Sequence, residues 1–105
     1  MLLQVNSSNF EEEVLKNEKP VLVAFFANWS HPSKMVIPIL EEINLEMEGR
    51  VHFVQLDIDE CHDVPNQYQV AGVPTSIFFK NGQVADRLFG PVPKSKFKSF
   101  IDNNL

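Results

Sequence analysis

The sequence predicts an α/β protein of three layers, in which helices cover both faces of a central mixed sheet. Strand and helix patterns alternate along the first two thirds of the chain, which favours right-handed parallel crossovers. A hairpin and a final helix then follow, and the hairpin adds antiparallel strands to the same sheet. We therefore expect about five strands and four helices, in the order β-α-β-α-β-α-β-β-α, within one domain of residues 1–105.

The first three elements have distinct patterns. Residues 2–5 (LLQV) predict a short strand. Residues 7–17 predict a helix, because Ser7 or Ser8 can cap it and glutamates follow in its first turn. Residues 21–27 (VLVAFFA) are continuously apolar, β-branched and aromatic. That composition is typical of a strand buried on both faces of a sheet.

A long helix is expected from about residue 32 to residue 47. Its predicted inner face follows a four-residue repeat of apolar side chains at Met35, Ile39, Ile43 and Met47, with Leu40 alongside. Pro38 lies inside this helix and should kink it, since proline cannot donate a hydrogen bond to the preceding turn. Gly49 is expected to end it.

The second half predicts two further strands and two helices around a hairpin. Residues 50–59 alternate in a strand pattern, and residues 61–70 predict a short helix interrupted by proline. Asn81-Gly82 is a strong signal for a tight hairpin between the strands on either side of it. Residues 93–105 predict an amphipathic closing helix whose inner face holds Phe97, Phe100 and Ile101.

The bulk composition limits the functions to consider. The 105 residues carry a net charge of −5, with a pI of about 5.0. This argues against a nucleic-acid partner, because phosphate binding needs a basic patch. No apolar run approaches the roughly 20 residues that span a bilayer, and the N-terminus lacks the basic region of a signal peptide. We expect a cytoplasmic protein without a membrane partner, in which the single cysteine, Cys61, forms no internal disulfide.

Four segments, in order, resemble the thioredoxin family over nearly the whole chain. They are VAFFANWSHPSK, VQLDIDE, VAGVPTSIFFKNGQV and the glycine after DRLF, Gly90. The resemblance implies the thioredoxin fold and a protein-disulfide reductase that needs no bound cofactor. It also implies disulfide-bearing or extended-peptide protein substrates, a reductase of the thioredoxin-reductase type as electron donor, and a monomer.

The chain departs from the family at its redox motif. Where the family has Cys-x-x-Cys, this chain has Ser30-His31-Pro32-Ser33. The resemblance places the nucleophile at Ser30 and the resolving thiol at Ser33. A cysteine at a helix N-terminus is a nucleophile because free N–H groups and the helix dipole stabilise its thiolate, and thioredoxin is itself a standard example of such a lowered pKa. Serine keeps the shape but stays protonated and forms no exchangeable bond to sulfur, so we expect no dithiol activity.

Two interpretations of the serines stay open. In the first, a parent protein has cysteines and both were replaced by the closest isostere; the retained Trp29, Pro32, Lys34 and Val73-Pro74 favour it. In the second, the protein is a naturally redox-silent module that binds peptides. It is favoured by Ala24, where the family usually places a buried aspartate that accepts protons, and by Gln55, where many bacterial members have lysine.

The resemblance also predicts a binding groove. Pro74 matches the family's cis-proline, which would expose the backbone N–H and C=O of Val73 to an extended peptide that adds as a strand. We expect Trp29, Val73 and Gly90, together with Pro91, to form a flat apolar patch around Ser30. We further expect Ser30 to be more exposed than Ser33.

Other candidate chemistry is weaker. His31 lies between the serines, but a serine hydrolase would also need a third group to orient it and an oxyanion hole. Cys61 and His62, with His52 and Asp59 nearby in sequence, match no zinc-binding spacing. We therefore expect no metal site, and interpret these residues as a helix-start cysteine and surface histidines.

Overall fold

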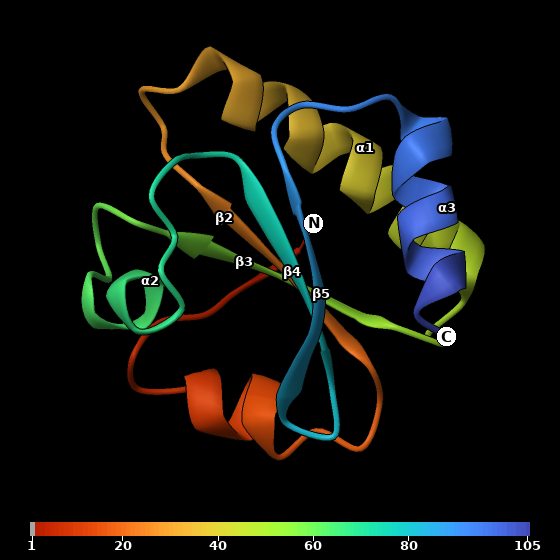
Figure 1. The fold of residues 1–105 in the computed structure, drawn as a ribbon, viewed down its shortest axis with the longest axis horizontal. Helices are drawn as coiled ribbons and strands as arrows, with labels where there is room; N and C mark the ends of the chain where they lie inside the picture. The colour runs from red at the N-terminus through yellow and green to blue at the C-terminus, as the bar shows by residue number, and fades with distance from the viewer. Residues whose placement is uncertain (1) are drawn as a thin grey trace.

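The computed structural model describes residues 2–105 and contains a five-stranded sheet with helices on both faces (Figure 1). This is the three-layer α/β arrangement that the sequence predicts, with the expected order of elements. Their bounds are β1 Leu3–Gln4, η1 Glu11–Leu15, β2 Val21–Phe26, α1 His31–Met47, β3 His52–Asp57, α2 Asp63–Gln67, β4 Thr75–Lys80, β5 Gln83–Phe89 and α3 Lys94–Asn103.

The sheet has the strand order β1-β3-β2-β4-β5. The first three strands are parallel, while β4 runs antiparallel to β2 and β5 antiparallel to β4. β2 lies in the centre and all its residues are buried, as its apolar run predicts. Phe25 pairs with Thr75, which pairs with Phe89. The end of β2, the start of β4 and the end of β5 therefore meet at one edge of the molecule, at the top of Figure 1.

Two hydrophobic clusters hold the layers together, one on each face of the sheet. Leu22 and Phe78 point from the sheet towards α1 and α3, where they meet Leu40 and Phe97. The other face packs against η1 and α2. There the rings of Phe10, Tyr68 and Phe79 contact one another, with centroids 5.2 to 5.8 Å apart.

The first helical segment differs from the prediction at its start. Neither serine caps it: the capping position is Phe10, and no side chain accepts a hydrogen bond there. Instead Asn6 Oδ1 accepts the Ser8 N–H at 2.9 Å, in the local turn that asparagine favours. The segment η1 is a π-helix, since the Lys16 N–H donates to the Glu11 carbonyl five residues back, at 2.8 Å.

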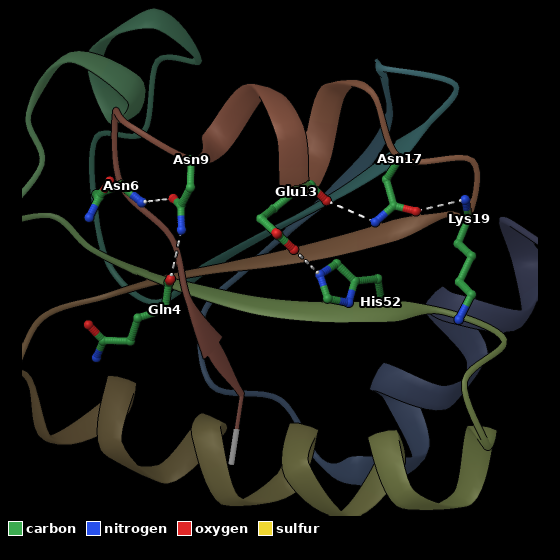
Figure 2. A network of polar contacts seen from close by, with 7 residues as sticks. All are labelled: Gln4, Asn6, Asn9, Glu13, Asn17, Lys19 and His52. Atoms are coloured by element: carbon green, nitrogen blue, oxygen red, sulfur yellow. Dashed lines mark hydrogen bonds and ion pairs between the residues drawn. The ribbon is translucent and has the colours of Figure 1, made fainter.

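Polar contacts fasten η1 and its flanking turns to the sheet (Figure 2). His52, at the start of β3, meets Glu13 with its Nε2 atom 3.1 Å from Oε1. Asn17 Nδ2 donates to the Glu13 carbonyl at 3.0 Å, and Asn9 Nδ2 donates to the Gln4 carbonyl at 3.3 Å. These contacts keep η1 above β3 while its apolar side covers the second cluster.

The buried face of α1 also differs from the prediction. The helix buries Ser33, Val36, Leu40, Ile43 and Met47, whereas Met35 is 53% exposed and Ile39 only partly buried. A strict four-residue repeat advances by about 40° per step around an α-helix, so it leaves the core side within a few turns. Pro38 lies inside the helix on its exposed side, and the expected kink stays a prediction.

The end of α1 needs left-handed backbone at two residues. The helix ends at Met47, and both Glu48 (φ 52°) and Gly49 (φ 83°) follow in that conformation. Glu48 thus takes the first left-handed position, one residue before the predicted glycine. Such a conformation favours glycine because a Cβ atom crowds the following carbonyl oxygen.

The hairpin forms at Asn81-Gly82, as predicted, with both residues at positive φ (53° and 77°). β5 then carries a bulge. Phe78 pairs with Asp86 but Phe79 pairs with Val84, so Ala85 is an extra residue in the edge strand.

The closing helix α3 buries Phe97, Phe100 and Ile101, as predicted. Ion pairs join it to α1: Lys94 Nζ lies 2.6 Å from Glu42 Oε1 and also contacts Glu46, while Lys98 Nζ lies 3.2 Å from Glu46 Oε1. Within residues 2–105, no helix combines the length and the hydrophobicity that crossing a membrane requires.

Candidate functional site

Ser30 starts helix α1 at the edge where the three strand ends meet. Its backbone is extended (φ −95°, ψ 109°), and its Oγ accepts the N–H of Ser33 at 3.2 Å. Pro32 lies in the first turn, where a missing N–H costs nothing. Ser30 therefore caps α1. A thiolate sulfur at this position would meet the same helix N-terminus and its partial positive charge.

Ser33 lies one turn further along and is enclosed by the protein. It has no exposed surface, whereas Ser30 is 7% exposed, so the predicted order of exposure is right although both are buried. The Ser33 Oγ has no hydrogen-bond partner, and no other buried side-chain N or O atom within residues 2–105 shares this condition. A buried hydroxyl that makes no hydrogen bond costs about 1–3 kcal/mol.

The loop before β4 lies at the same edge of the sheet, because Thr75 at the start of β4 pairs with Phe25 near the end of β2. The Val73–Pro74 peptide bond is cis. Thr75 Oγ1 donates to the Gly72 carbonyl at 2.6 Å, and the Gly90 N–H donates to the Pro74 carbonyl at 2.9 Å. These bonds fix the loop from both sides. Val73 itself is half-buried, and across residues 2–105 neither its N–H nor its C=O makes a hydrogen bond.

The side chains around the serines are unequally exposed. Trp29 is 70% exposed, and His31 and Pro32 also face solvent. Gly90 is buried, so it contributes the N–H bond that holds Pro74 rather than the apolar surface that we expected from it. Sequence reasoning missed Phe89, which is 69% exposed at the end of β5. Alternation along the edge strand could have placed it outside.

Position 24, beneath the start of helix α1, holds no acidic side chain. Ala24 is packed in the first cluster, and Gln55 Nε2 donates to the Leu2 carbonyl at 2.9 Å. A cavity of about 330 Å³ opens nearby, lined in part by Phe26, Lys34 and Gln55. Gln55 brings no carboxylate into this space, and the one acidic residue in its lining is Glu41 of α1.

Asp57 is the one buried carboxylate within residues 2–105, and the sequence reasoning did not single it out. Asp57 is the last residue of β3, where it pairs with Phe26, and it follows Gln55 by two residues. Its side chain therefore points to the face of the sheet that α1 covers. Its Oδ2 accepts the Asn28 side-chain amide at 3.3 Å and its Oδ1 accepts the Asp59 N–H at 2.9 Å. These bonds hold the turn that precedes Trp29.

Cys61, His52 and His62 lie apart from this site. Cys61 is buried, with its Sγ 3.4 Å from Ser7 Oγ and 3.3 Å from Asp63 Oδ1. Hydrogen bonds from Ser7 and then from Cys61 lower the pKa of the Asp63 carboxyl. Within residues 2–105, no three His, Cys, Asp or Glu side chains gather closely enough to hold a metal ion.

Comparisons with known proteins agree with the fold. The Thioredoxin family model matches residues 1–103. A thioredoxin from Rickettsia bellii is 40% identical over 105 residues, which is the whole of both chains. Thioredoxin C-2 from Corynebacterium nephridii and a thioredoxin from Pseudomonas aeruginosa are each 38% identical over 104 residues, covering 99% of this chain and 96% of theirs.

Proposed function

The chain belongs to the thioredoxin family, and we propose that it is the scaffold of a protein-disulfide reductase whose two thiol positions hold serine. In this form it binds extended protein segments but does not exchange disulfides. The cysteine-bearing parent is a thiol–disulfide oxidoreductase that takes electrons from a reductase of the thioredoxin-reductase type. The proposal includes a cytoplasmic monomer that folds as a single domain.

The loss of redox activity follows from the chemistry of oxygen. Disulfide exchange needs a thiolate that attacks sulfur, and then a second thiol that releases the bound partner. The Ser30 Oγ is engaged as a cap of α1, and the Ser33 Oγ has no base within hydrogen-bond distance. Neither hydroxyl is therefore activated, and oxygen gives no exchangeable link to a partner's sulfur.

The unpartnered Ser33 hydroxyl is the observation that best supports a cysteine-bearing parent. A buried hydroxyl loses its hydrogen bonds to water and here gains none. A thiol is a weak donor and behaves in a core as a small apolar group, so it loses much less in the same place. The surroundings of residue 33 therefore suit sulfur better than oxygen.

A naturally redox-silent peptide-binding module is the alternative, and position 24 favours it. Ala24 is packed among apolar neighbours and Gln55 is bonded to the Leu2 carbonyl, so the family's buried aspartate has no counterpart at that position. A protein that never deprotonates a resolving thiol does not need that acid. Both candidates share the same binding surface, so they differ only at residues 30 and 33.

The peptide-binding surface has three supports. The N–H and C=O of Val73 are free to pair with a partner strand, and a partner added there would gain backbone hydrogen bonds. Trp29 offers a large exposed aromatic ring beside Ser30. The loop itself is held by bonds to Gly72 and Gly90, so little ordering is needed when a partner binds.

Restoring both thiols tests the proposal. The double variant Ser30→Cys/Ser33→Cys should reduce the disulfides of insulin with dithiothreitol as electron donor, measured as turbidity of the released B chain. The unchanged chain should show only the background rate. The control variant Ser95→Cys/Ser99→Cys places two thiols on the exposed side of α3 and should also stay at background.

Failure of the restored protein would decide between the candidates. If the double variant folds, forms its internal disulfide and still does not accelerate insulin reduction, the reductase proposal is wrong. The redox-silent binding module would then be the better account.

A further inference from the structure

A second hollow lies beside the Val73–Pro74 loop, on the side away from α1. Its volume is about 230 Å³ and most of its lining is apolar. The loop after α2 forms one wall and the end of β5 the other. The residues that matter for the argument are Gln69, Ala71, Gly72, Thr75, Arg87 and Phe89.

Phe89 forms the outer wall of this cavity. Its ring is 69% exposed, yet its edge rests against Gly72, where an added Cβ would lie 3.0 Å from the ring carbon Cε1. The absence of a side chain at Gly72 thus lets the ring lie close to the loop. Phe89 pairs with Thr75 at the edge of the sheet where Ser30 starts helix α1, so its ring lies next to the backbone of Val73.

Arg87 gives the cavity its charge. It is two residues before Phe89, so both side chains leave β5 on the same face of the sheet. Its guanidinium donates to the Tyr68 carbonyl, which holds it at the rim. It is the one charged side chain in the cavity lining, and a guanidinium has five N–H donors, so others remain for a carboxylate.

We propose that this cavity is a side-chain subsite for the bound protein segment, and that it selects an apolar residue with a carboxylate close by. The proposal rests on the proposed function, because it assumes an extended segment paired with Val73. Such a segment passes the mouth of the cavity, and one of its side chains, within two residues of the paired one, enters it. The apolar side chain packs against Phe89 and Ala71, while the carboxylate meets Arg87.

The charge of the molecule makes this selection specific. The chain carries a net charge of −5, so acidic segments are repelled over most of its surface. Arg87 provides an opposite charge at the cavity. An acidic residue should therefore be accepted near the cavity and be unfavourable elsewhere in the same segment.

Mixed-disulfide exchange on the Ser30→Cys variant provides the test, because it fixes the peptide over the site even when binding is weak. The probes are alanine-based peptides whose single cysteine is joined to glutathione. The variant thiolate attacks the peptide sulfur, a new disulfide forms, and glutathione leaves as the thiolate, so the electrons balance. The peptides carry leucine or alanine two residues from the cysteine, on either side, and glutamate or lysine next to that residue.

We expect a leucine peptide to exceed its alanine partner by about tenfold in the exchange constant, since about half of the gain from fully burying three carbons should be realised in an open cavity. Glutamate should exceed lysine by roughly two- to fivefold, as for exposed ion pairs, and the ratio should shrink in high salt. Adding Arg87→Glu should invert the glutamate–lysine order, and Arg87→Gln should abolish it. Phe89→Ala should remove the preference for leucine.

The matched control is Arg50→Glu, which reverses a charge on an exposed turn after α1 and should leave both ratios unchanged. Circular dichroism checks that each variant is folded. If the exchange constants are equal for all peptides, or if Arg50→Glu changes the ratios as much as Arg87→Glu, the subsite is wrong. If no peptide forms a mixed disulfide at all, the proposed function fails together with it.

Discussion

Replacing Ser33 with alanine should stabilise the protein, although the residue lies in the middle of the proposed site. Its Oγ is fully enclosed and makes no hydrogen bond. Removing the hydroxyl recovers the cost of burying it, about 1–3 kcal/mol. The small cavity left by one oxygen atom lowers this gain by about a few tenths of a kcal/mol. We therefore expect the free energy of unfolding to rise by roughly 1–2 kcal/mol.

The neighbouring serine should respond in the opposite direction. The Ser30 Oγ accepts the Ser33 N–H, and loss of such a cap lowers stability by about 0.5–2 kcal/mol. Serine-to-alanine substitutions at residues 30 and 33 should therefore change the free energy of unfolding in opposite directions. Ser33→Cys should also stabilise, because a thiol tolerates the missing hydrogen bond better than a hydroxyl does.

Urea unfolding, followed by circular dichroism at neutral pH, measures these changes if the slope m stays constant. Ser99→Ala, on the exposed side of α3, reports the helix propensity of alanine over serine, about 0.5 kcal/mol, and that value is subtracted. A loss of stability in Ser33→Ala after this correction would show that the hydroxyl has a stabilising partner. The case for sulfur at residue 33 would then fall.

Further predictions concern the hairpin and the α1–α3 contact. Gly82→Ala should destabilise by about 2 kcal/mol or more, because φ is +77° and the new Cβ would lie 2.6 Å from the Leu15 carbonyl oxygen. Gly90→Ala shares the positive φ (+94°) but has nothing within 4 Å, so urea unfolding should show a smaller loss; equal losses would contradict the clash. Hydrogen bonds from Lys94 and then Lys98 lower the pKa of Glu46, so its contribution to stability is present above the unfolded pKa and lost as pH falls through the folded one. Lys94→Met should flatten that acid branch in a urea–pH series, whereas Lys96→Met, which none of these ion pairs involves, should leave it unchanged.

The elements that local sequence specifies were predictable. β2 follows from its continuous apolar run, and the hairpin from Asn81-Gly82, whose two positive φ angles suit few other residues. The buried face of α3 follows from its spacing of apolar residues. In each case a few adjacent residues decide the structure.

The parts that depend on competition between neighbours were not predictable. Ser8 was a reasonable helix cap until the turn formed by Asn6 engaged its hydroxyl as well as its N–H. Met35 fits an apolar repeat, but the drift of that repeat around the helix turns it to solvent. The order of exposure of Ser30 and Ser33 could be predicted from the family, yet the missing partner of the Ser33 hydroxyl is a property of packing, which the chain order does not reveal.

The bulge in β5 has a consequence for how copies of this protein meet. An edge strand offers free backbone groups that can recruit an identical strand. Here the extra residue Ala85 breaks the regular spacing of those groups. A symmetric antiparallel pairing centred on Asp86 or on Arg87 would also place each charge against its own copy. The bulge and these like-charge contacts therefore oppose growth of the sheet across molecules into fibrils. The loop that is proposed to pair with a partner strand lies at another edge.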